Sequence, residues 1–166
     1  MSKTTEFELL KKESQPSDSE LMAFFDELPI VTVDEIVSQK WKGGAFETGH
    51  WASKALAEIK WFGKWYRTAF DALPLVCYNE EGKLISNQIM RGNASLWMIE
   101  FRGKVSATMV YDGAPIFDHF KKVDDTTIMG VMNGKKLEGW PEIVDHGKYF
   151  FFYLERIPEF PADFIE

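Results

Sequence analysis

A chain of 166 residues is long enough to bury a substantial core without disulfide or metal staples, and it is most simply one domain. The net charge of −7 and the lack of a basic stripe with interleaved aromatic residues exclude nucleic acid as an expected partner. The single cysteine excludes an intrachain disulfide. The polar N-terminus lacks the apolar core of a signal peptide, and no apolar run reaches membrane-spanning length. We therefore expect a cytoplasmic protein without a membrane span.

The N-terminal segment predicts an arm followed by a helix. Residues 1–16 are charged and show no clear period, which predicts a flexible arm before a single barrel domain over residues 17–166. Ser17 and Glu20 have the spacing of a capping box, in which each side chain satisfies a backbone amide of the first helical turn. Apolar residues follow at helical spacing until Pro29, so we expect a helix between these limits.

Two further helices are expected before the main sheet. Thr32 and Glu35 repeat the capping-box spacing and predict a short helix. Another helix is expected over residues 51–60, which places His50 at or near its N-terminus. The positive end of the helix dipole disfavours imidazolium there. We therefore expect a neutral His50, which either takes part in proton transfer or only caps the helix.

Aromatic residues are concentrated where the first strands are expected. Trp41 comes after the short helix and is followed by Lys42 and two glycines, an arrangement that closes one end of many small β-barrels. The run Trp61–Tyr66 then places Lys64 among four aromatic rings. Its ammonium group either reaches solvent past the rings or serves as a cation for an anionic ligand group in an apolar pocket.

Residues 94–133 predict a β-meander, because four apolar runs are divided by three turn signals. A hairpin over residues 75–87 should precede it, and a closing strand over residues 148–157 should follow it. Neither face of the meander strands is purely polar, which favours a closed or half-closed barrel. The expected fold class is mainly β (α+β): an antiparallel β-barrel or half-barrel of about seven to nine strands with two or three N-terminal helices.

The sequence holds few signals of catalysis. It has no phosphate-binding loop, dinucleotide-binding glycine pattern or nucleophile elbow, and we expect no cofactor. Cys77 lies in an apolar strand, where a thiol is usually inert. His50, His119 and His146 are not at metal-ligand spacing, so no metal site is predicted. Asp118 and His119 lie on opposite faces of one strand, so only one of them can face a barrel interior.

Several short runs resemble the GXWXG domain family over residues 30–66: Trp41–Gly44, Thr48–His50 and Trp61–Lys64. Gln39 stands where the name pattern has its first glycine. Residues 74–135 resemble the companion domain of unknown function that usually follows this family. The resemblance implies a fold and a set of positions, and no reaction. The tryptophan on the first strand is also similar to that of lipocalin-like barrels, in which a late arginine, here Arg156, packs across it.

Three functions follow as hypotheses. The first is binding of a small apolar or amphipathic molecule with an acidic or polar group in a barrel cavity, using Trp61, Lys64, Arg102, Tyr111 and Phe120. The second is a cofactor-free acid–base enzyme (an isomerase, lyase or hydratase) in which the proton is moved by His50, Asp118 and His119. The third is a structural or interaction domain with a filled core. A homodimer is left open.

Overall fold

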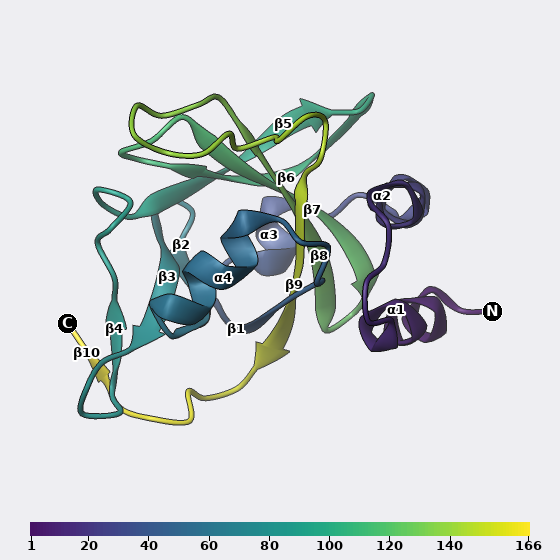
Figure 1. Ribbon diagram of the computed structural model, residues 1–166. Coiled ribbons are helices and arrows are strands. Elements are labelled where there is room, and N and C mark those ends of the chain that lie inside the picture. The colour runs from purple at the N-terminus through teal and green to yellow at the C-terminus, as the bar shows by residue number, and fades with distance from the viewer.

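Eight antiparallel strands close into a barrel in the computed structural model, which describes residues 1–166 (Figure 1). The strands are β1 (Gln39–Ala45), β2 (Trp61–Thr68), β3 (Asp71–Tyr78), β5 (Ala94–Phe101), β6 (Lys104–Tyr111), β7 (Ile116–Asp124), β8 (Thr127–Gly134) and β9 (Phe150–Ile157). They run in the order β3-β2-β1-β9-β8-β7-β6-β5, and a pairing of Ala72 with Ala94 closes the ring between β3 and β5. The predicted antiparallel barrel is therefore confirmed.

Two short strands extend the sheet beyond the barrel. β4 (Leu84–Ser86) pairs with the second half of β3, as expected for the predicted hairpin. β10 (Phe164–Ile165) pairs in parallel with β4, although Pro158 and Pro161 lead us to expect no order so late in the chain. The rings of Phe160 and Phe164 pack edge-on against Trp65, which holds this C-terminal segment on the barrel.

Four helices accompany the barrel: α1 (Lys3–Lys12), α2 (Asp18–Glu27), α3 (Val33–Ile36) and α4 (Trp51–Glu58). The predicted box at Thr32 forms, with Glu35 accepting a hydrogen bond from the Thr32 amide. At Ser17 one half of the predicted box forms, since the Ser17 side chain accepts a hydrogen bond from the Glu20 amide. None of these helices has the length and apolar character needed to cross a bilayer.

The segment predicted as a flexible arm contains α1, a helix docked on the outside of the barrel (Figure 1). Phe7 and Leu10 are buried, and the Phe7 ring packs edge-on against Phe46 and Tyr153. Only a few apolar residues face the barrel, so the segment shows a weak helical period in sequence. Contacts with residues far along the chain, rather than local signals, hold it in place.

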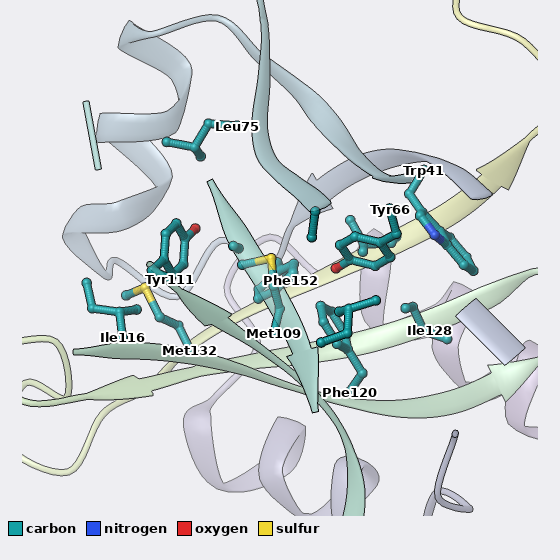
Figure 2. Packing of buried hydrophobic residues seen from close by; sticks show 14 of the residues in the cluster. Trp41, Tyr66, Leu75, Met109, Tyr111, Ile116, Phe120, Ile128, Met132 and Phe152 are labelled. Carbon is teal, nitrogen blue, oxygen red and sulfur yellow. The ribbon is translucent and has the colours of Figure 1, made fainter. Parts of the chain in front are cut away.

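Two hydrophobic clusters lie on opposite sides of the barrel wall. The inner one fills the barrel and includes Trp41, whose indole N–H donates to the Ile36 carbonyl at 3.3 Å (Figure 2). The outer one packs α1 and α2 against the outer face of the strands. Arg156 is the register partner of Trp41 across β1 and β9.

Candidate functional site

A cavity of about 100 Å³ lies in the barrel beneath α4. Seventeen residues line it, fifteen of them hydrophobic, and they come from α4, several barrel strands and the loops around Ile89 and Trp140. Figure 2 shows part of this wall, including Leu75, Ile116 and Met132. Trp51 and Trp140 lie in edge-on contact at the α4 side, with ring centroids 6.3 Å apart. The cavity therefore suits a small apolar molecule.

Glycine on β1 makes room for one wall of the cavity. The indole of Trp61 lies directly over the Cα of Gly43, where a Cβ would overlap its six-membered ring. The Trp61 indole N–H donates to the Pro74 carbonyl at 3.1 Å, which fixes the ring. The glycine that follows the tryptophan in the family pattern thus has a direct physical role at the cavity.

Lys64 and Asp118 are the charged residues of the cavity wall, and they form an ion pair with Nζ and Oδ2 3.0 Å apart. Each side chain is 3% exposed. Lys64 Nζ also donates to the Pro74 carbonyl at 3.2 Å, and it lies 5.4–5.7 Å from the ring centres of Trp61, Tyr111 and Phe152. Burial raises the pKa of the Asp118 carboxyl, although the Lys64 ammonium opposes this shift.

Two tyrosines surround the ion pair. Tyr111 lines the cavity, while Tyr66 lies deeper, and its buried hydroxyl has no hydrogen-bond partner. Figure 2 shows the Tyr66 hydroxyl pointing into the barrel interior, on the side of Phe152. Burial, and next the charge of Asp118, raise the pKa of both phenols, so both remain neutral donors at ordinary pH. An unpartnered buried hydroxyl indicates that the interior accommodates another polar group.

His50 caps α4 and does not line the cavity. Its Nδ1 accepts a hydrogen bond from the Ala52 amide at 3.1 Å, so Nε2 carries the proton and donates to the Ile143 carbonyl at 3.1 Å. Burial lowers the pKa of His50, which keeps the ring neutral. One nitrogen therefore caps the first turn of α4, and the other ties this end of the helix to the loop that contains Ile143.

His119 points to the outer face of β7, away from Asp118. It stacks on Phe101 at 4.1 Å between ring centres, and its Nδ1 lies 3.0 Å from the Thr108 hydroxyl. Burial lowers its pKa to about 4. The alternation of β7 thus places Asp118 inside and His119 outside.

Arg102 and Phe120 lie away from the cavity. Arg102 forms a two-pronged ion pair with Asp26 of α2 on the protein surface, with both N–O distances at 2.7 Å. Phe120 is inside the barrel, where it packs edge-on against Phe152 without lining the cavity. Of the residues predicted from sequence, Trp61, Lys64, Tyr111 and Asp118 come together at the cavity, whereas His50, His119, Arg102 and Phe120 do not line it.

Sequence reasoning missed several wall residues. Phe150 and Phe152 both face the cavity. They lie two residues apart on β9, and because side chains alternate between the two faces of a strand, the sequence already indicates that they share a face. Met132 and Leu75 carry no signal that separates a cavity wall from an ordinary core. Cys77 is buried in the inner cluster and is not part of the wall. No three His, Cys, Asp or Glu side chains are grouped to hold a metal ion.

Two family models match successive parts of the chain. Residues 23–82 match the model of the GXWXG protein family, and residues 92–156 match that of a domain of unknown function, DUF4334. The predicted resemblance to these two families, in this order, is confirmed. A crystal structure of a protein from Thermomonospora curvata is similar over 93% of this chain and 97% of that chain, with a TM-score of 0.79 and 29% identity. No curated protein matches the chain.

Proposed function

We propose that this chain, in which a GXWXG segment precedes a DUF4334 segment, binds a small and largely apolar molecule with a neutral polar group in the cavity beneath α4. The observation that carries the proposal is the buried ion pair of Lys64 and Asp118 in an otherwise apolar wall. An ion pair inside a core is often less stable than hydrophobic residues of similar volume. Its presence beside a cavity is therefore better explained by recognition than by packing.

The apolar wall supports binding of the hydrophobic part of the ligand. Trp61, Phe150 and Phe152 offer large aromatic surfaces, and burial of apolar area gives a ligand about 25 cal/mol per Å². Trp51 and Ile89 are partly exposed at the edge of the cavity. These residues mark the side from which a molecule would enter.

The ion pair determines which polar group fits. An ammonium has three N–H donors, and Lys64 uses two of them, one on Asp118 and one on the Pro74 carbonyl, which leaves one for a ligand. Asp118 already neutralises Lys64, so a ligand carboxylate would bring a second negative charge into the apolar interior. The sequence alone is compatible with either an acidic or a neutral polar group on the ligand. The pairing of Lys64 with Asp118 favours a neutral ketone, aldehyde or alcohol.

Calorimetric titration with three matched six-membered rings tests the proposal: cyclohexanone, cyclohexanecarboxylate and methylcyclohexane. We expect cyclohexanone to bind at least about tenfold more tightly than the carboxylate at pH 7, because only the acid buries an excess charge. Tighter binding of the carboxylate would contradict the proposal.

A pair of variants on α4 locates the binding site. Ala55 lines the cavity, whereas Ala57 lies on the same helix and is exposed. Ala55→Phe should fill the cavity and abolish cyclohexanone binding, while Ala57→Phe should leave it unchanged. Equal effects of the two variants would mean that the ligand binds elsewhere.

A further inference from the structure

We propose that the cavity is also a catalytic site for proton transfer on an enolisable ketone, with Asp118 as the base and with Lys64 and Tyr111 as donors to the carbonyl oxygen. This inference rests on the proposed binding of a neutral polar ligand, and it adds a reaction to it. The three side chains line the same cavity, although they come from β2, β6 and β7.

The spacing of these groups matches the two atoms of a ketone that must be contacted. The acidic C–H and the carbonyl oxygen of an enolisable ketone belong to neighbouring carbons, so the base and the donor must also be neighbours. Lys64 Nζ and Asp118 Oδ2 are 3.0 Å apart, and the Tyr111 ring centre is 5.7 Å from Lys64 Nζ. A carbonyl beside Lys64 would therefore present its adjacent C–H to Asp118.

The proposed step balances without any further reactant. Asp118 removes the proton from the carbon next to the carbonyl, and the C–H electron pair moves to form an enolate. Its negative oxygen is stabilised by hydrogen bonds from Lys64 and Tyr111. Asp118, now a carboxylic acid, returns the proton to the same carbon or, in a β,γ-unsaturated ketone, to the γ carbon. The second outcome moves the double bond into conjugation and makes the protein an isomerase.

The surroundings of Lys64 and Asp118 favour proton transfer, beyond the electrostatic attraction within the pair. The wall is apolar, so donors aimed at a developing oxyanion act more strongly there than in water. Burial raises the pKa of Asp118, which makes its carboxylate a stronger base. The two histidines that sequence analysis offered as proton carriers are held elsewhere, His50 as a helix cap and His119 on the outer face of β7.

Exchange of hydrogen for deuterium on cyclohexanone in D₂O, followed by proton NMR, tests the base. The wild-type protein should accelerate loss of the α-hydrogen signal over buffer, and Asp118→Asn should reduce this rate by about 100-fold or more. Asp125→Asn is the matched control, because Asp125 is an exposed carboxylate outside the cavity and its loss should leave the rate unchanged. Exchange that persists in Asp118→Asn would overturn the proposal.

A second variant guards against misfolding of Asp118→Asn, which disturbs a buried pair. Tyr111→Phe removes only a hydroxyl, so methylcyclohexane should bind as it does to the wild type. The exchange rate should fall by about 100-fold, as is typical for loss of one donor to an oxyanion. An unchanged exchange rate in Tyr111→Phe would remove Tyr111 from the mechanism and contradict the proposal as stated.

Calorimetry and hydrogen–deuterium exchange together distinguish a failure of the binding proposal from a failure of the catalytic proposal. If calorimetry detects cyclohexanone binding but the wild type gives no exchange above buffer, the catalytic inference is wrong and the binding function stands. If cyclohexanone does not bind, the proposed function itself falls. For the isomerisation step, 3-cyclohexen-1-one should be converted to the conjugated 2-cyclohexen-1-one by the wild type, with the same dependence on Asp118.

Discussion

Lys64 of β2 and Asp118 of β7 meet across the barrel interior at 3.0 Å, although their strands are not neighbours in the sheet. Both side chains are almost fully buried. A pair of this kind links opposite walls of the barrel, and each charge depends on the other because both side chains are shielded from solvent. The energetic consequences can be measured on the protein without knowledge of its ligand.

Removal of one partner should be far more harmful than replacement of both. Lys64→Met leaves Asp118 buried without a cation, and we expect a loss of about 3–5 kcal/mol of unfolding free energy. The double variant Lys64→Met with Asp118→Leu replaces the pair by apolar side chains and should recover most of this loss. Urea unfolding measures both values. A double variant no more stable than Lys64→Met would show that the pair contributes through packing rather than charge.

Acid should destabilise the protein through His119. The folded state lowers its pKa to about 4, while an unfolded histidine has a pKa near 6.5, so only the unfolded chain is protonated between these values. Stability should therefore fall by about 3 kcal/mol as the pH drops from 6.5 to 4.

Unfolding midpoints in urea across this pH range measure the effect. His119→Gln should make the dependence shallower, because it removes this titrating group, while His50, whose pKa burial also lowers, retains part of it. His146→Gln is the control, since His146 is exposed and should leave the slope as in the wild type. A slope as steep in His119→Gln as in the wild type would assign the acid sensitivity to other groups.

Gly43 of β1 and Gly63 of β2 should differ in their tolerance of a methyl group. A Cβ at Gly63 would overlap the backbone carbonyl of Trp41. A Cβ at Gly43 would overlap the ring of Trp61, a side chain that can shift at the cost of its hydrogen bond to Pro74. We expect Gly63→Ala to cost more than the roughly 1–3 kcal/mol typical of overpacking, and Gly43→Ala to stay within it. Gly43→Ala should also weaken cyclohexanone binding, because the displaced indole would enter the cavity. The reverse order of stabilities would contradict this account.

The Cys77 thiol should be inert in the folded protein. It is buried, and burial raises its pKa to about 12. Labelling with a disulfide reagent at pH 8 should be slow in buffer and fast in concentrated urea. Rapid labelling of the folded protein would instead make Cys77 a candidate nucleophile.

The strands and the capped helices could be predicted from the sequence, because turn residues and capping residues mark their ends. The turns at Gly103 and Gly113 divide the meander where β5, β6 and β7 end and begin. The capping residues Ser17 and Thr32 precede α2 and α3. These features depend on residues close together in the chain, so a single sequence predicts them.

The site depends on which face of each strand turns inward, and that choice is made by distant contacts. The sequence shows that Asp118 and His119 oppose each other, but α2 and Phe101 on the outside decide that His119 faces outward. Arg102 carries the same charge as Lys64, but Asp26 of α2, which is far from it in the sequence, pairs with it on the surface. The pairing of Lys64 with Asp118 could not be predicted from the sequence either. It depends on closure of the barrel, which brings β2 and β7 to opposite sides of one interior.

A crystal structure of the protein grown with cyclohexanone tests the central claim most directly. We predict ring density in the cavity beneath α4, against Trp61 and Phe152, with the ketone oxygen within hydrogen-bond distance of Lys64 Nζ or the Tyr111 hydroxyl. Density for the ketone outside this cavity, or a cavity that remains without it at saturating concentration, would contradict the account.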